Sequence, residues 1–390
     1  MTPKEIELLS QLTVVIPTCE KPKNLERAIE YWRDTPVTVH IVDGSKTRWF
    51  SIGKLLDVPT INYHHIPPES NEGILGNYCR RMRYGAILPT TKYSALCADD
   101  DVFAISGLCA ILNTLENDST VDAMIGRAAL YERNGSALNW KLHYADLRNS
   151  PDYRSDNVSV RLLNDVRTPF LYYGVVKTFL WRQLLQISFK YEILTTEKLM
   201  RIVDRALCRI KITETVVWLR QGYVPRTNVP NEFKVGQPSV VKQLLDLQRF
   251  DVRRKMCRQV VIAIRLSSPN VGKIKARRLA RKLTKQKIIR NNKKVAHWKK
   301  RFIGKLVKLF AVFPLHLRSK FVNALPWRIS GPLGFYKIKP EALRATARSD
   351  LDGFVASMNN SGIDFCRVEL EEYEKLLLMP REELRVRADI

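Results

Sequence analysis

Three consecutive aspartates, Asp99, Asp100 and Asp101, follow a short run of apolar and small residues, Tyr93 to Ala98. Three carboxylates at one point of a chain repel one another, so a fold that gathers them there needs a cation beside them. The usual cation is a divalent metal, because Mg²⁺ and Mn²⁺ prefer oxygen ligands. Residues two apart on an extended chain face the same side, so Asp99 and Asp101 are the expected ligand pair. An acidic cap between a strand and a loop is the alternative explanation.

The segments around these aspartates predict a parallel sheet. Residues 93–98 are expected to form a buried strand. Two further strands are indicated by the β-branched run 13–20, which Pro17 interrupts, and by residues 37–45, which include Asp43. Between those two strands, apolar residues at helical spacing predict a helix over 23–32. The order strand, helix, strand implies parallel strands joined by right-handed crossovers.

Polar residues stand at the end of each predicted strand, at 18–20, 43–45 and 99–101. The carboxyl ends of parallel strands meet at one edge of a sheet, which is where open α/β sheets bind their ligands. Three separate segments are therefore expected to converge on one crevice.

At this point the chain resembles a known family. The segments VVIPTCEKPKNLERAIEYW, IVDGS and TTKYSALCADDDVF look like those of GT-A nucleotide-sugar glycosyltransferases, in the bacterial group related to glycosyltransferase family 2. The resemblance covers roughly residues 12–130 and thins out toward residue 235. It implies an α/β fold of GT-A type, with a Rossmann-like, mostly parallel sheet flanked by helices, followed by a basic, mainly helical C-terminal region.

The resemblance also implies an activity, that of a metal-dependent hexosyltransferase. The donor would be a nucleotide diphosphate sugar, with a UDP-sugar expected first, and the acceptor a hydroxyl of a glycan or a lipid-linked molecule. Mn²⁺ or Mg²⁺ would stabilise the charge that develops on the departing diphosphate. The implied setting is bacterial surface polysaccharide synthesis (O-antigen, lipopolysaccharide or capsule), with other polysaccharide-assembly enzymes as further partners.

Roles for individual residues follow from the same resemblance. Asp99 and Asp101 would bind the metal, and Asp100 would contact the sugar. The nucleotide base and ribose would be held by residues at the first two strand ends, namely Pro17, Thr18, Glu20 and Asp43. Asp43 also has a simpler explanation as a turn residue before Gly44 and Ser45. Arg220, at the end of a late strand, would meet the diphosphate, and one arginine among Arg80, Arg81 and Arg83 is a further candidate.

An inverting transferase needs a general base for the acceptor hydroxyl. In the family this is a carboxylate on a helix after the metal strand, which makes Glu197 the first candidate, with Glu192 and Asp204 behind it. Glu197 could equally be an acidic residue at a helix N-terminus. The Glu-Asp pair of family 2 is not evident, so retention or inversion of configuration stays open.

Residues 122–131 and 215–220 are predicted to be strands, and residues 191–208 a helix. Residues 132–160 are rich in Asn, Ser, Asp and Pro and predict a loop or an insertion. These segments are expected to complete the catalytic domain around the three converging strand ends.

The composition allows a large folded domain with an appendage, because 45% of the 390 residues are hydrophobic. The seven cysteines stand singly, which argues against a zinc ribbon or a disulfide framework and favours a reducing cytoplasm. The N-terminal residues are acidic and lack an apolar core, so no secretory signal is expected. No uncharged apolar run reaches the ~18 residues of a membrane span.

The net charge of +26 is concentrated in one segment, since residues 252–320 contain 23 Lys and Arg and no Asp or Glu. The sequence therefore predicts three units. Residues 1–235 form the catalytic domain, 236–330 a basic helical region, and 331–390 a small, mainly helical tail.

Within the basic region, residues 300–313 predict a helix with apolar residues on one face and cationic residues on the other, the pattern of an interfacial helix. We expect attachment to an anionic membrane surface, peripheral on the cytoplasmic face of the inner membrane. The same charge could serve a nucleic-acid-binding protein. However, nucleic acid explains only the charge and not the apolar face, so no nucleic acid is expected as a partner. An inactive GT-A scaffold is the third alternative.

Overall fold

The computed structural model describes residues 1–49, 58–134, 137–143, 151–163, 171–193, 196–221, 250–284, 351–360 and 365–378. The predicted amphipathic helix over 300–313 lies outside these ranges.

The first half of the sheet is parallel. Its strands lie in the order β3-β2-β1-β4 and are all parallel to their neighbours, with bounds β1 (Leu12–Thr18), β2 (Thr38–Asp43), β3 (Ile61–His65) and β4 (Tyr93–Leu96). The β-branched residues of β1 are buried on both faces of the sheet, as is usual for a central parallel strand. These strands confirm the strand-helix-strand order expected from the sequence.

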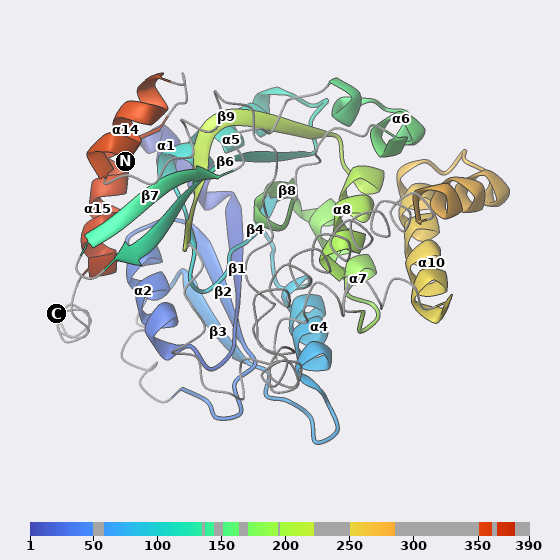
Figure 1. Cartoon of the computed structure of the whole chain (residues 1–390), viewed down its shortest axis with the longest axis horizontal. Helices are drawn as coiled ribbons and strands as arrows, with labels where there is room; N and C mark the ends of the chain where they lie inside the picture. Colours follow the sequence, from blue (N-terminus) through green and yellow to red (C-terminus); the bar gives the residue numbers. More distant parts are fainter. Residues whose placement is uncertain are drawn as a thin grey trace, which may run out of the picture.

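Helices cover both faces of this parallel half (Figure 1). They are α1 (Pro3–Ser10), α2 (Pro22–Trp32) and α4 (Ile74–Gly85). Successive side chains of a strand point to opposite faces. Accordingly, Val14 of β1 shares a core with Leu25 of α2, whereas Val15 shares a different core with Met82 of α4. The apolar positions predicted in the 23–32 helix are the ones that α2 buries.

The second half of the sheet is mixed and continues in the order β8-β6-β9-β5, with β7 paired to β6. The strands are β5 (Val102–Phe103), β6 (Ala123–Asn134), β7 (Ala137–His143), β8 (Val175–Lys177) and β9 (Ile210–Gln221). The elements between them are α5 (Ile105–Asn117), η1 (Pro151–Arg154), α6 (Val158–Leu163) and η2 (Leu171–Tyr173). The α/β class with flanking helices is confirmed.

The prediction of a loop or insertion over 132–160 is wrong in part. The segment contains β7, which pairs antiparallel with β6, and also η1 and the start of α6. Although the segment is mostly polar, three apolar side chains at alternate positions of β7 are buried, namely Leu138, Trp140 and Leu142. Pairing with β6 and the core on one face stabilise the strand despite its many turn-forming neighbours.

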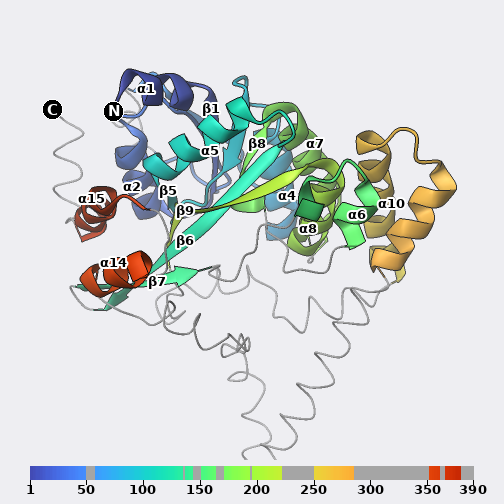
Figure 2. The same ribbon diagram turned by 90° about the horizontal axis from the view of Figure 1, so that it is seen from above.

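Helices at the far end of the molecule extend the core beyond the sheet. They are α7 (Thr178–Ser188), α8 (Thr196–Leu207), α10 (Phe250–Ser267) and a helical stretch over 273–284. The 191–208 helix is shorter than predicted, because it begins only at Thr196. Figures 1 and 2 show α10 and the stretch after it beyond α7 and α8. All four share one hydrophobic core with α4.

Two C-terminal helices pack back on the sheet (Figure 2). They are α14 (Leu351–Asn360) and α15 (Arg367–Leu378). Phe354 of α14 and Leu370 of α15 are buried in one core with Trp140 of β7. The described part of the predicted 331–390 tail therefore shares a core with the sheet.

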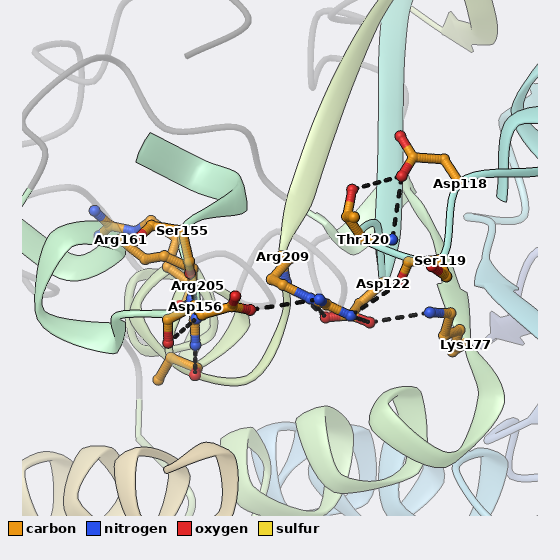
Figure 3. Close-up of polar contacts among 11 residues, drawn as sticks. Asp118, Ser119, Thr120, Asp122, Ser155, Asp156, Arg161, Lys177, Arg205 and Arg209 are labelled. Carbon is orange, nitrogen blue, oxygen red and sulfur yellow. Dashed lines mark hydrogen bonds and ion pairs between the residues drawn. The ribbon is translucent and has the colours of Figure 1, made fainter. Parts of the chain in front are cut away.

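An ion-pair cluster joins three strands at the amino end of the parallel strands (Figure 3). Asp122 precedes β6 and accepts hydrogen bonds from the guanidinium of Arg209 at 2.8 and 3.0 Å and from Lys177 at 3.0 Å. Burial alone would raise the pKa of Asp122, but these bonds lower it below its ordinary value. The β4–β8 and β8–β6 pairs are both antiparallel, so this end lies opposite Asp99–Asp101. The cluster is therefore a structural link and not part of the crevice.

Candidate functional site

The predicted strand ends do converge. Thr18 ends β1, and its hydroxyl donates a hydrogen bond of 2.8 Å to Oδ2 of Asp99, which follows β4. The backbone carbonyl of Thr18 accepts from the N–H of Gly44, just after β2, at 2.9 Å. One residue thus bonds to both neighbouring strand ends. The sequence-predicted residues at these three ends lie together at the carboxyl edge of β2, β1 and β4.

Asp43 is held rigidly at the end of β2. Its Oδ1 accepts from the backbone N–H of Ser45 at 2.8 Å and from the Ser45 hydroxyl at 2.5 Å. Its Oδ2 accepts a 2.5 Å bond from the hydroxyl of Tyr63 on β3. The side chain is buried. Asp43 therefore closes a tight turn, as the simpler explanation has it, and its contact with a nucleotide base or ribose stays a prediction.

The β1 end turns sharply after Thr18. Glu20 has a φ of 55°, the left-handed region that residues with a Cβ seldom adopt. Its N–H donates to the Ser45 hydroxyl at 2.7 Å, and its carboxylate accepts from the N–H of Lys46 at 2.8 Å. These bonds tie the β1 and β2 ends together. Pro17, half-buried in β1, lies opposite Val42 of β2.

Asp99 is buried, and both of its carboxylate oxygens are engaged. Oδ2 accepts from Thr18, and Oδ1 forms an ion pair of 2.8 Å with the ammonium of Lys21. Burial raises the pKa of Asp99, and the charge of Lys21 opposes that shift without cancelling it. For Lys21 burial would lower the pKa, but the charges of Asp99 and Asp100 outweigh burial and raise it.

The other two aspartates differ from one another in exposure. Asp101 is buried, and its Oδ1 accepts from the backbone N–H of Gln221 at the end of β9, at 2.8 Å. Burial raises the pKa of Asp101, Asp100 raises it further, and the charge of Arg220 opposes the shift. The side chain of Asp100 is 34% exposed and lies 3.7 Å from Lys21. Asp100 is therefore the carboxylate of the three that faces outward most.

The oxygen donors here fit a hard divalent cation in chemical type. Within the described ranges no cluster of three His, Cys, Asp or Glu side chains has the geometry of a metal site. In this structure the ammonium of Lys21 is the cation between Asp99 and Asp100. Asp99 and Asp101 therefore stay predictions as ligands, and a metal that binds Oδ1 of Asp99 would compete with Lys21 for it.

Arg81 of α4 holds the end of β1 in place by a hydrogen bond to Thr18. It is buried, and it donates at 2.6 Å to the carbonyl of Thr18 and at 2.8 Å to the side-chain oxygen of Asn77. A Cβ at position 44 would lie 2.3 Å from atoms of both Arg81 and Asn77, so the approach requires Gly44. Arg81 thus holds the β1 end from inside the fold.

The other two arginines of α4 have contacts elsewhere. Arg80 pairs with Glu72, and Arg83 donates to the carbonyl of Phe189. Neither contact involves the strand ends that form the crevice.

Arg220 lies near the end of β9, as the sequence predicts, and close to the acidic loop formed by Asp99–Asp101. Its guanidinium carbon stands 4.9 Å from the ring centre of Trp218, which itself stacks on Tyr173 with 3.4 Å between centroids. The next residue, Gln221, bonds to Asp101. Because Gln221 is bonded to Asp101, the preceding residue of β9, Arg220, is held beside the three aspartates.

The candidates for a general base are less well defined. Glu197 lies in the first turn of α8, but its side chain falls outside the described residues. Asp204 is fully buried, accepts hydrogen bonds from the N–H groups of Leu171 and Arg205, and has a pKa that burial raises to about 6. Asp204 therefore belongs to the core of the protein. Glu192 is exposed.

A clamp formed by the C-terminal helix α15 holds the chain just after Asp99–Asp101, and the sequence alone did not predict this contact. Glu369 of α15 accepts from the backbone N–H groups of Ile105 and Ser106 and, at 2.6 Å, from the Ser106 hydroxyl. The N-cap residue of α5, Ala104, has no side chain that could do so. Glu369 thus caps α5 directly after Asp99–Asp101.

Two tyrosines extend this clamp to the aspartates. The Tyr131 hydroxyl donates at 2.9 Å to the carbonyl of Asp100 and lies 3.4 Å from the Tyr373 hydroxyl of α15. Tyr373 also lines a small recess with the three aspartates and Arg27. Residues more than 250 positions away thus shape the site, and no local signal in the sequence indicates this.

Comparisons with known proteins give only distant likenesses. No protein-family model matches the chain, and no curated protein sequence matches it. A structure of S. aureus TarS residues 1–349 with UDP is 13% identical and covers 93% of this chain and 91% of that chain, with a TM-score of 0.43. The same TarS segment with UDP-GlcNAc gives 13% and 0.41 over the same shares.

Another S. aureus TarS structure is 11% identical and has a TM-score of 0.37 over 67% of this chain. The chain spans 44% of the length of that structure. At these identities and TM-scores the likeness leaves the function to be judged from the residues themselves.

Proposed function

We propose that this protein is a glycosyltransferase that moves a sugar from a nucleotide diphosphate sugar to a hydroxyl acceptor. The observation that carries the proposal is the convergence of Thr18, Asp43 and Asp99–Asp101 at one sheet edge, linked by hydrogen bonds. Ligands of open α/β sheets bind at this edge. The sequence segments that resemble GT-A transferases are the ones that build it.

The donor would lie along the edge with its base toward β2 and β3. Asp43 and Tyr63 form a fixed polar pair there, and backbone groups of residues 18–20 flank it. Hydrogen bonds from such preorganised groups recognise an N–H edge or ribose hydroxyls at little entropic cost. A UDP-sugar is the first donor to test.

The diphosphate would then reach the aspartates near Lys21 and Arg220. Arg220 is held in place over Trp218, and Lys21, which pairs with Asp99 in this structure, would turn toward the diphosphate once a metal takes its place. Cations fixed where negative charge develops stabilise the transition state. Asp99 and Asp101 would hold Mn²⁺ or Mg²⁺, and Asp100, the most exposed of the three, would contact the sugar. The metal, when bound, supplies further positive charge to the leaving group.

Transfer also needs a base for the acceptor hydroxyl, and Glu197 on α8 is our candidate. The acceptor is proposed to be a glycan or lipid-linked hydroxyl, as in bacterial surface polysaccharide synthesis. Within the described ranges, no helix combines the length and apolar composition needed to cross a bilayer. We also propose that basic surface groups attach the protein to the cytoplasmic face of an anionic membrane.

A donor screen tests the proposal. The full chain is incubated with UDP-, GDP-, CDP- and dTDP-sugars, including UDP-GlcNAc, with and without Mn²⁺, and with water as the stand-in acceptor hydroxyl. Release of the nucleoside diphosphate by hydrolysis of the sugar–phosphate bond is measured. We expect release from one nucleotide class, with Asp156→Asn matching wild type because Asp156 is 93% exposed at the opposite edge. No release and no binding of any of these nucleotides would refute a transferase of this class.

A further inference from the structure

A second concave surface lies at the far end of the molecule. It is a groove of about 1460 Å³ between α10 and the helical stretch 273–284, with Lys190 and Tyr191 at one side. Figures 1 and 2 show these helices beyond α7 and α8, away from the strand ends that form the candidate donor site. The groove is thus a separate feature of the fold.

The groove is lined almost entirely by cationic and apolar groups. Eight of its fifteen lining residues are Lys or Arg, and none is Asp or Glu. Arg253 has a buried Nε atom that lacks a hydrogen-bond partner among the described residues. A concave surface lined by one sign of charge focuses the field and raises the local concentration of oppositely charged partners. The charge pattern points to an anionic partner.

Helix α10 has two different faces. One face buries Met256, Val260 and Ile264 in the core, and Gln259 on this face donates to the carbonyl of Ile187. The other face lines the groove and leaves large apolar side chains open to solvent. Phe250 is 72% exposed and Leu266 50%, and Ile262 is exposed as well. An isolated exposed apolar residue is ordinary, but several among arginines on one face mark an interaction surface.

Two kinds of macromolecule could supply the anions. Nucleic acid would use stacking on aromatic side chains beside the cations. Only Tyr191 and Phe250 among the lining residues are aromatic, and the remaining apolar ones are mainly aliphatic. A bilayer with anionic headgroups matches both properties, since guanidinium groups bind phosphate in a bidentate manner and aliphatic side chains enter the acyl boundary.

We propose that the groove between α10 and residues 273–284 docks the protein on an anionic phospholipid bilayer. The arginines meet headgroup phosphates, and Phe250, Ile262 and Leu266 enter the interface. The proposal places membrane contact on residues other than the 300–313 segment. It does not depend on transferase activity, because vesicle binding is measured without a sugar donor.

The experiment is co-sedimentation of the full chain with vesicles of phosphatidylcholine alone or with phosphatidylglycerol added. The test variant is Arg277→Glu with Arg281→Glu, which reverses two lining charges. The matched control is Arg278→Glu with Lys282→Glu on the same helix at the same spacing. Positions 278 and 282 are exposed and do not line the groove. Both double variants carry the same net charge.

We expect wild type and the 278/282 control to bind phosphatidylglycerol vesicles, and the 277/281 variant to bind at least about tenfold more weakly. Ile262→Ser with Leu266→Ser should remove the binding that persists in high salt, because salt does not screen apolar burial. Equal loss in both charge variants would overturn the proposal, since net charge alone would then explain binding. Binding to duplex DNA but not to the anionic vesicles would overturn it too.

Discussion

The ammonium nitrogen of Lys21 lies 2.8 Å from Oδ1 of Asp99, at the point where β1 turns away from the sheet. Lys21 therefore supplies the positive charge that three adjacent carboxylates need. The same ammonium is 3.7 Å from Asp100, so it stands between two of the three. A divalent cation that binds these carboxylates must compete with Lys21 for them.

This competition predicts that Lys21→Met binds Mn²⁺ at least about tenfold more tightly than wild type, because a unit charge has been removed a few ångströms from the ligands. Lys23→Met is the control, since Lys23 is exposed on the same turn. Calorimetric titration of Mn²⁺ into each protein gives the affinities. Equal affinity in both variants would show that Lys21 does not share the position of the metal.

The cap on α5 predicts a stability effect from a distant residue. Glu369→Ala leaves the N–H groups of Ile105 and Ser106 without their carboxylate acceptor. The free energy of unfolding should fall by about 0.5–2 kcal/mol, the cost of losing a helix cap at half-buried donors. Urea unfolding measures it, with Glu372→Ala, an exposed residue of the same helix, as the control. Equal stability of the two variants would contradict the capping role.

The cluster around Asp122 predicts a pH-dependent contribution. Its pKa is lowered in the folded protein from 3.8, so the stabilisation is present above pH 3.8 and is lost as the pH falls through the lower folded value. At pH 7 Asp122→Asn should lower the free energy of unfolding by about 1–3 kcal/mol. The difference in the free energy of unfolding between Asp122→Asn and wild type should become smaller below pH 3.8. Urea titrations at several pH values test this, and a difference that widens in acid would refute it.

If Glu197 is the general base, its substitution should lower kcat without weakening the binding of the donor. Glu197→Gln should lower kcat by roughly 10²–10⁴ while the affinity for the donor persists, because the amide cannot accept a proton. Glu192→Gln, an exposed residue just before α8, should keep most of the activity. A Glu197→Gln enzyme with near-normal kcat would remove this residue from the mechanism.

Much of the parallel half of the sheet was predictable, because its signals are local. The β-branched run of β1, the helical spacing of α2 and the polar ends of three strands lie within short windows. The parallel order then places Thr18, Asp43 and Asp99 at one edge without knowledge of any contact. The structure adds the bonds that link them.

The supporting residues were not predictable, because they depend on contacts between distant segments. Glu369 caps a helix 264 positions away, and nothing in its own helix distinguishes it from neighbouring glutamates. Lys21 resembles an ordinary solvated lysine until Asp99 is placed beside it. β7 was missed because its polar neighbours resemble a loop, and only pairing with β6 makes it a strand.

We propose above that the edge formed by Thr18, Asp43 and the aspartates turns over a nucleotide diphosphate sugar. The most direct test of this proposal is the rate of nucleoside diphosphate release from the best donor, in Mn²⁺, by wild type, Asp99→Asn, Asp101→Asn and the Asp156→Asn control. We expect a loss of ~10²-fold or more for both site variants, the scale of an electrostatic stabiliser, and no change for the control. Full activity in both site variants, folded by circular dichroism, would contradict it.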